Sequence, residues 1–377
     1  MKKILFFFLL LSISVINAQY TLRLVVTNVA TKNNDAIYVA GNFNNWNPKD
    51  EKYKLKDFGA NVKAVVIKDV AAGNYAFKFT RGSFDKVECA ADGKDIDDRL
   101  IEVNEDISKE CKIEGWKDDY PQQPKRYTAS PNVKIIDTAF YIPQLQRTRK
   151  IWVYLPKSYA SSSVNYPVLY MNDGQNLFNE QTAAFGEWGV DECLDTLQKK
   201  IGKDCIVIGI DNGGNKRMTE YNPYDNNQFG KGEGKEYVDF IVKNLKPFID
   251  SKFRTKKSAA YTFAGSSMGG LISLYAVIQY PDVFGGAGIF SPAFWIVPQL
   301  FVDADKFSTT ASPAFYFYAG GNESATMVSD MNKMADIIQH KANYTMRRVI
   351  NPLGKHNEKY WREEFPSFYT WLMSVMP

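Results

Sequence analysis

From about residue 133 to the end of the chain, short apolar runs alternate with amphipathic segments, and this alternation constrains the fold most strongly. Apolar runs of strand length need burial on both faces, which a mainly parallel sheet covered by helices provides. The clearest amphipathic helix is predicted over Tyr237–Phe253. The predicted strands are Lys134–Ile142 and Lys150–Leu155, which look antiparallel, followed by Pro167–Met171, Cys205–Ile210, Ala259–Ala264, Gly288–Ser291 and Ala314–Ala319. We therefore predict an α/β domain over residues 133–377.

The preceding part of the chain follows a different pattern. Short alternating runs are separated by turn-forming clusters, and no helical period is present, which indicates a small all-β, immunoglobulin-like sandwich over residues 19–114. The predicted strands are Thr21–Val26, Ala36–Ala40, Val62–Ile67 and Tyr75–Thr80. Residues 115–132 are polar and rich in proline, and they are predicted to be a linker.

The first 18 residues have the pattern of a secretory signal peptide. Lys2 and Lys3 precede the apolar run Ile4–Val15, and cleavage is expected near Ala18. We therefore expect a protein exported to the periplasm or the extracellular space, with no later segment of membrane-spanning length. The net charge is only +4, and the Lys and Arg residues form no continuous block. No nucleic-acid partner is therefore predicted.

Export permits disulfides, and the chain has four cysteines, for which three pairings are open. We favour Cys89–Cys111 and Cys193–Cys205, because each pair then lies inside one predicted domain. No cysteine has zinc-ligand spacing with a nearby histidine, so neither a metal site nor a cofactor is predicted.

The segment Gly265–Gly270 contains a G-x-S-x-G pattern with Ser267 at its centre. An apolar strand precedes the pattern and an apolar helix, Leu271–Gln279, follows it, which is the setting of a nucleophile elbow. Glycines are needed there because side chains two residues on either side of the serine would collide with neighbouring backbone. An ordinary glycine-rich turn is the alternative interpretation.

A serine nucleophile requires a base and an orienting carboxylate. Of the two histidines, His356 lies in a loop after the strand-like Thr345–Ile350, whereas His340 ends a helical stretch. We predict His356 as the base and Glu323, in the turn after Ala314–Ala319, as the acid; Asp330 falls inside the following helix and is the poorer candidate.

Two backbone amides are predicted to stabilise the oxyanion of an acyl-transfer reaction. One belongs to Met268, directly after the nucleophile. The other belongs to Gln175, in the segment Asp173–Phe178 after the third strand.

These motifs resemble, in order and spacing, those of the esterase D and feruloyl esterase group, carbohydrate esterase family one of the α/β-hydrolase superfamily. The match rests on the segment Asp173–Phe178, on Ser267 within its glycines, on Gly320–Glu323 and on Gly354–His356. The resemblance implies an α/β-hydrolase fold and ester hydrolysis through an acyl-enzyme, without a cofactor. Glu323 stands where the group more usually has Asp. Phe294, Trp295, Tyr360 and Trp361 follow strands at the expected pocket edge and are candidate substrate-binding residues, with core packing as the alternative.

The front module resembles starch- and glycogen-binding carbohydrate-binding modules over Ile37–Pro48 and Tyr75–Gly82. This resemblance implies the fold and makes Trp46 a candidate for stacking on a sugar ring, although packing at the sandwich edge is the alternative. Phe84 stands where such modules often have Trp.

The combined interpretation is an exported serine carboxylic-ester hydrolase that removes feruloyl or acetyl groups from polysaccharide. A siderophore-ester hydrolase is the second hypothesis. A catalytically silent glycan-binding protein is the third, and the complete set of triad candidates argues against it.

Overall fold

The computed structural model describes residues 19–376 except 45, 60, 122–123, 227–228, 257–260 and 342–343. The predicted signal peptide, residues 1–18, therefore lies outside the described residues. Backbone contacts divide the chain into two compact units, with the division between residues 122 and 123. No helix among the described residues has both the length and the apolar character that crossing a membrane requires.

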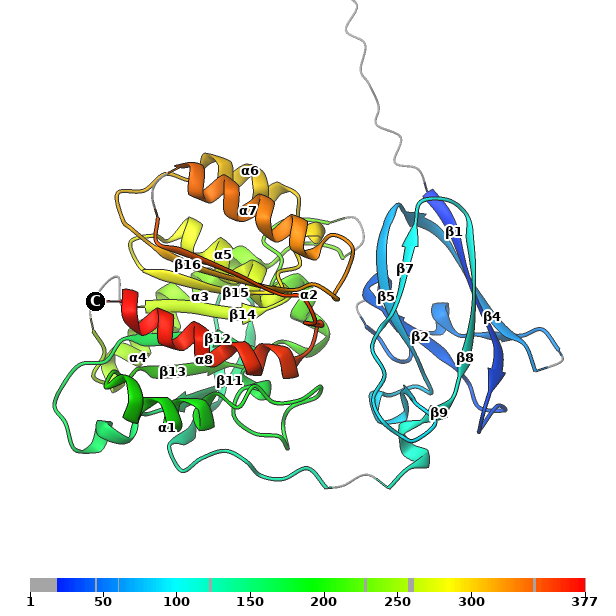
Figure 1. Ribbon diagram of the computed structural model, residues 1–377, viewed down its shortest axis with the longest axis horizontal. Helices are drawn as coiled ribbons and strands as arrows, with labels where there is room; N and C mark the ends of the chain where they lie inside the picture. Colours follow the sequence, from blue (N-terminus) through cyan, green and yellow to red (C-terminus); the bar gives the residue numbers. More distant parts are fainter. Residues whose placement is uncertain are drawn as a thin grey trace, which may run out of the picture. The chain divides into compact units, whose positions relative to one another are not determined.

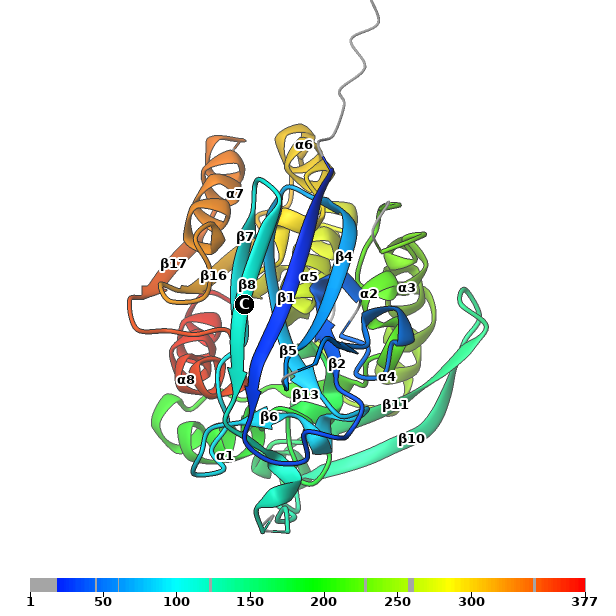
Figure 2. The same cartoon turned by 90° about the vertical axis from the view of Figure 1, so that its right-hand side faces the viewer.

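The described part of the first unit consists of β-strands and short 3₁₀ turns. Its sheets have the orders β3-β4-β1-β8 and β2-β5-β7, with β6 and β9 as a separate pair; Figure 2 shows β1 between β4 and β8. Along β1 the side chains of Leu22, Leu24 and Val26 are fully buried and alternate with more exposed ones, as a strand with one covered face requires. The strands are β1 (Gln19–Val29), β2 (Tyr38–Gly41), β3 (Lys56–Asp57), β4 (Lys63–Ala71), β5 (Gly73–Thr80), β6 (Glu88–Cys89), β7 (Arg99–Val103), β8 (Ile107–Ile113) and β9 (Gly115–Trp116).

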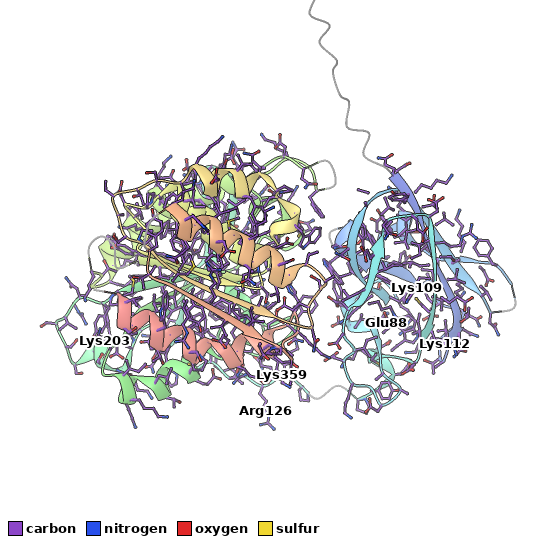
Figure 3. The ribbon with its side chains drawn as sticks, turned by 45° about the horizontal axis from the view of Figure 1, so that its top comes forward. Glu88, Lys109, Lys112, Arg126, Lys203 and Lys359 are labelled. Carbon is purple, nitrogen blue, oxygen red and sulfur yellow. The ribbon has the colours of Figure 1, made fainter. Side chains whose placement is uncertain are left out.

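The start of the predicted linker belongs to this unit. Trp116 is fully buried, and its indole N–H donates to the carbonyl of Thr31 at 3.0 Å. Its strand pairs with β6, which carries the buried Glu88; that carboxylate, labelled in Figure 3, accepts from Arg99 Nη2 at 2.7 Å. One large apolar anchor thus keeps a segment of polar composition inside the fold.

The second unit is built on a mixed eight-stranded sheet of order β10-β11-β13-β12-β14-β15-β16-β17 in the described part of the chain. β11 pairs antiparallel with β10 and with β13. The six strands β12 to β17 are all parallel to one another. The strands are β10 (Val133–Ile142), β11 (Arg147–Tyr154), β12 (Val168–Asn172), β13 (Ile206–Ile210), β14 (Tyr261–Ser266), β15 (Gly286–Phe290), β16 (Ala314–Gly320) and β17 (Met346–Asn351). The predicted α/β class is confirmed.

Helices cover both faces of this sheet (Figure 1). Phe315 and Phe317 of β16 pack with α3 to α7, whereas Tyr316 and Tyr318 pack on the opposite face with α1 and α8. On that second face Lys203, labelled in Figure 3, donates to the carbonyl of Met373 near the end of α8. The helices are α1 (Val190–Ile201), α2 (Arg217–Glu220), α3 (Gly234–Phe240), α4 (Lys246–Lys252), α5 (Met268–Gln279), α6 (Gln299–Lys306), α7 (Met327–Lys341) and α8 (Glu358–Val375).

The helix predicted over Tyr237–Phe253 is interrupted by a π-helical turn at Ile241–Leu245. Pro247, two residues after this turn, has no N–H to donate to the preceding turn, which favours a local change of hydrogen-bond spacing. Of the predicted strand Ala259–Ala264, residues 259 and 260 lie outside the described residues.

The predicted disulfides are wrong in this structure, because all four cysteines have free thiols. Cys89 lies on β6 and Cys111 on β8, which belong to different sheets. Cys193 lies on α1, whereas Cys205 directly precedes β13 in the layer below. Lying inside one domain did not join the members of either pair in a disulfide.

Candidate active site

Ser267 lies in the sharp turn between β14 and α5. Its backbone has φ 58° and ψ −121°, a conformation that L-residues rarely adopt. The turn is held by two hydrogen bonds, from the amide of Ser267 to the carbonyl of Phe290 at 2.9 Å and from the amide of Leu271 to the carbonyl of Ser267 at 3.1 Å. The side chain is partly exposed, whereas the neighbouring Ser266 is buried. Such strain at one exposed serine is typical of a nucleophile elbow.

The two glycines around this serine are required by close backbone approach. A methyl group on Gly265 would lie 2.9 Å from the carbonyl carbon of Gly269, which is closer than packed atoms come. A methyl group on Gly269 would in turn lie 3.2 Å from Cβ of Asn172 on the neighbouring strand. The crowding inferred from the sequence is therefore present.

His356 and Glu323 are in direct contact. Nδ1 of His356 lies 2.8 Å from Oε2 of Glu323, whose side chain is buried. Oε1 of the same carboxylate accepts from the amide of Gly320 and from the hydroxyl of Ser291, each at 2.6 Å. Three donors thus surround one buried carboxylate. A hydrogen bond at Nδ1 leaves Nε2 of the imidazole as the nitrogen that can accept a proton.

A glycine pair brings the loops of these two residues together. Gly320 ends β16, Gly354 lies between β17 and α8, and a methyl group on Gly320 would be 2.4 Å from the carbonyl carbon of Gly354. The amide of Asn322 donates to the carbonyl of Gly354 at 2.9 Å. Side chains at this crossing would hold the Glu323 and His356 loops apart.

Ser291 connects this pair to the elbow, and the sequence analysis missed it as a site residue. Its hydroxyl donates to Glu323 and accepts from the indole N–H of Trp361 at 2.8 Å. Two residues later, the amide of Ala293 donates to the carbonyl of Ser267 at 3.2 Å. Ser267, Glu323 and His356 therefore lie at one edge of the sheet, at the ends of β14, β16 and β17. Ser291 has a φ of 45°, and nothing in the sequence around it predicted this backbone conformation.

The predicted oxyanion donors occupy two adjacent turns. Met268 is the first residue of α5, so its amide has no carbonyl partner within that helix. Gln175 lies in the 3₁₀ turn η6 (Gly174–Asn176), which follows Asp173 in the left-handed conformation. Asn172 ties the two turns together, since its side-chain amide donates to the carbonyl of Gly269 at 3.1 Å.

An ion pair between the partly exposed Arg217 and the buried Asp173 lies behind these turns and was not foreseen. Arg217 of α2 donates from Nε and Nη2 to the two carboxylate oxygens of Asp173, at 2.7 and 2.8 Å. Burial disfavours the charge on Arg217, but the charge of Asp173 outweighs this effect and raises the pKa of the guanidinium. The side-chain amide of Asn212 also donates to Oδ1 of Asp173 at 2.7 Å. This network fixes the residue that precedes η6.

Glu358, the first residue of α8, is a second unforeseen buried acid near the site. Burial raises its pKa to about 7, and the charge of Asp173 adds to the rise, whereas His356 and Arg217 lower it. The carboxylate accepts a long hydrogen bond from Asn176 at 3.4 Å. In the sequence, only its position two residues after the predicted base pointed to Glu358.

The remaining candidates for substrate contact differ in how far their side chains are exposed. Phe294 was a wrong choice for substrate contact, because it is fully buried and packs edge-on against Phe301. Trp361 is 4% exposed and stacks its ring edge-on against His356 at 5.1 Å, so it buttresses the imidazole. Trp295 is 38% exposed and remains a candidate for substrate contact.

The rejected alternatives both lie on α7. His340 is exposed in the last turn, where its Nδ1 contacts the carbonyl of Asp336. Asp330 lies in the first turn of the same helix.

We expect Ser291→Ala to lower the free energy of unfolding by about 1–3 kcal/mol, because the buried indole N–H of Trp361 loses its acceptor. Denaturant unfolding of the full chain measures this. Ser329→Ala is the control, since its hydroxyl donates to Thr326 on an exposed surface and its loss should change stability by less than about 0.5 kcal/mol. Equal stability of the two variants would contradict the structural role of Ser291.

Three curated relatives are similar to this chain. The uncharacterized protein YbbA of Bacillus subtilis (strain 168) is 30% identical over 242 residues, which is 59% of this chain and 92% of YbbA. The iron(III) enterobactin esterase of Dickeya dadantii (strain 3937) is 26% identical over 61% of this chain and 53% of its own length. An alpha-amylase of Niallia circulans is 31% identical over 90 residues, 24% of this chain and 7% of the amylase.

Solved structures share the fold. The enterobactin esterase FES of Shigella flexneri matches with a TM-score of 0.53 at 14% identity, covering 90% of this chain and 88% of its own. A ferulic acid esterase matches with a TM-score of 0.50 at 17% identity, covering 66% of this chain and 99% of its own. The family described as "Putative esterase" matches residues 142–372, more than half of the chain. The protein therefore belongs to this esterase family, with a mixed-sheet fold of the α/β-hydrolase type, and is a serine esterase.

Proposed function

We propose that Ser267, His356 and Glu323 form the catalytic triad of an exported carboxylic-ester hydrolase. The observation that carries the proposal is the buried Glu323–His356 pair at the same sheet edge as the strained Ser267. The buried carboxylate orients the imidazole and stabilises its charged form. Glutamate serves this role as well as aspartate where the longer side chain is held, as it is here by Ser291 and Gly320.

The reaction has two steps. Nε2 of His356 takes the proton of the Ser267 hydroxyl while Oγ bonds to the ester carbonyl carbon, and the imidazolium then gives that proton to the leaving alkoxide. In the second step the imidazole takes a proton from water as the water oxygen attacks the acyl-enzyme. The released Ser267 oxygen recovers its proton from the imidazolium, so the enzyme returns to its starting state.

The negative charge that develops on the carbonyl oxygen requires fixed donors. We assign this role to the amides of Met268 and Gln175, which lie at the starts of α5 and η6. The hydrogen bond from Asn172 to Gly269 and the Asp173–Arg217 pair support their positions. Donors held by buried contacts need little reorganisation when charge develops.

A fluorophosphonate probe is expected to label the full-length wild type and Ser266→Ala, and not Ser267→Ala, because only the hydroxyl at 267 is activated. Gel fluorescence and mass spectrometry of the labelled peptide measure this.

His356→Ala is expected to lower kcat at least about a thousandfold, by comparison with other triad deletions. His340→Ala is the matched control, and near-normal turnover of His356→Ala would remove that residue from the mechanism.

For the substrate, we propose feruloyl or acetyl groups on polysaccharide. The ferulic acid esterase of similar fold and the exposed Trp295, which offers a flat ring for a phenolic or sugar group, support this class. A siderophore ester is the second candidate. The coverage of 90% of this chain by the enterobactin esterase fold and the relative from Dickeya dadantii favour it.

The two substrate classes are separated by the acids that the enzyme releases. We expect ferulate or acetate from decorated xylan at a higher kcat/KM than linearised product from a siderophore trilactone, with Ser267→Ala subtracted as background. Mass spectrometry of both reactions measures the ratio. A ratio in favour of the trilactone replaces the first substrate class with the second.

We further propose that the first unit binds an α-glucan through Trp46. Trp46 is partly exposed in a left-handed turn, and its amide donates to the carbonyl of Gly41 at 2.8 Å, so the backbone is held while the ring has access to solvent. The short identity with an alpha-amylase supports a glucan ligand.

Affinity electrophoresis in soluble starch tests the role of Trp46. Trp46→Ala is expected to weaken retention about tenfold, the loss of one stacking contact. Phe58→Ala is the control, because Phe58 is 66% exposed in the same unit but lies outside the matching segments. Equal retention of wild type and Trp46→Ala would contradict the proposal.

A further inference from the structure

Three acidic side chains, none of which belongs to the proposed triad, converge at the start of α1. Glu187, Asp191 and Glu192 each place a carboxylate oxygen within 4.8 Å of the others. Asp191 is fully buried and Glu187 is 7% exposed. Each of these two has one oxygen with a donor: Thr128 Oγ1 donates to Glu187 at 2.9 Å, and the amide of Ser130 donates to Asp191 at 2.7 Å.

Three further carboxylate oxygens of the cluster have no donor among the described residues. Among the described residues, Oε1 of Glu187, Oδ1 of Asp191 and Oε2 of Glu192 are buried without a hydrogen-bond partner, and so is the hydroxyl oxygen of Ser130. Buried carboxylate oxygens without a donor are costly, and each such group calls for an explanation by a bound species. These oxygens belong to two chain segments that meet here, one around Ser130 and one from Glu187 to Glu192.

The charge balance indicates the species. Burial raises the pKa of Glu187 and of Asp191 to about 7, and the neighbouring Glu192 raises both further. Glu180 also raises the pKa of Glu187, whereas Arg362 lowers it. When the three cluster carboxylates are ionised they carry −3, and the nearby charges of Arg362 (+1) and Glu180 (−1) cancel each other, so the sum stays at −3. A divalent cation offsets most of this charge.

We propose that Glu187, Asp191 and Glu192 bind a divalent cation, with Ca²⁺ as the ion that fits the donor set. All the donors are oxygens, which hard cations prefer, and the cluster contains neither histidine nor cysteine. Ca²⁺ accepts irregular arrangements of carboxylates, whereas Mg²⁺ demands near-octahedral geometry. Because the cluster lacks the Cys/His spacing of zinc sites, no metal was predicted from the sequence.

The cation would join the segment around Ser130 to the loop that follows η6. The amide of Trp188 donates to the carbonyl of Asn176 at 2.8 Å, and that of Val190 donates to Leu177 at 3.0 Å. The loop that carries the Gln175 amide is therefore hydrogen-bonded to the residues on either side of Gly189. The site stabilises the folded chain, and it stands whether or not Ser267 is the nucleophile.

Thermal unfolding of the chelator-treated full-length protein at pH 8 tests the proposal. We expect millimolar CaCl₂ to raise Tm by about 5 °C relative to NaCl of equal ionic strength, because the ion binds only the folded chain. Luminescence of Tb³⁺ sensitised by the neighbouring Trp188 provides a binding signal that Ca²⁺ reverses. Glu187→Gln/Asp191→Asn is expected to lose both effects. Asp195→Asn, on the same helix but bonded to Tyr154, is the control and keeps both.

A proton shared within the cluster is the competing explanation, and pH separates the two. Carboxyls whose pKa is raised on folding stabilise the protein below their unfolded pKa, and this stability is lost as pH rises through about 7. Without Ca²⁺ the wild-type Tm should therefore fall between pH 5 and 8, and Ca²⁺ should restore it at pH 8. A fall in Tm that Ca²⁺ leaves unchanged, without Tb³⁺ luminescence, overturns the cation site. Loss of the Ca²⁺ response in Asp195→Asn overturns its assignment to this cluster.

Discussion

The hydrogen bonds to the carboxylate of Glu323 are the interactions on which the candidate active site depends. A buried carboxylate is tolerated only where donors surround it, and here they come from Ser291, Gly320 and His356. These residues follow three neighbouring strands, β15, β16 and β17. The carboxylate therefore fixes the relative positions of three loops at once. The hydrogen bond to Glu323 and the ring of Trp361 together orient the imidazole of His356.

Backbone crowding provides the second half of this constraint. Gly265 faces Gly269 inside the elbow, and Gly320 faces Gly354 beneath the Glu323–His356 pair. Each pair lets two backbone segments approach more closely than side chains permit, so functional groups from different loops reach one another. Strain at Ser267 is sustained because the surrounding sheet and α5 leave it no alternative conformation.

Buried charge is concentrated around the η6 turn. Asp173 and Arg217 pair on one side of it, Glu358 lies nearby, and the cluster of Glu187, Asp191 and Glu192 lies where its loop enters α1. Buried acids cost stability when they are ionised, and raised pKa values are the sign of that cost. An ordinary core would exclude them. Their concentration beside the predicted oxyanion donor is consistent with a region built for electrostatics at the expense of stability.

The amino-acid sequence by itself determined the mixed α/β class, the order of the catalytic candidates and the glycine frame of Ser267, because periodicity and steric crowding act over a few residues. Tertiary structure alone decided which side chains support them. Ser291, Arg217 and Glu358 are ordinary polar residues in the sequence, and they acquire a role only because distant strands end at the same edge. The same reason explains the failures: the side chain of Phe294 is buried in the core, and the four cysteines remain free thiols. Local patterns encode elements, whereas burial and contact between elements are set by how the whole sheet packs.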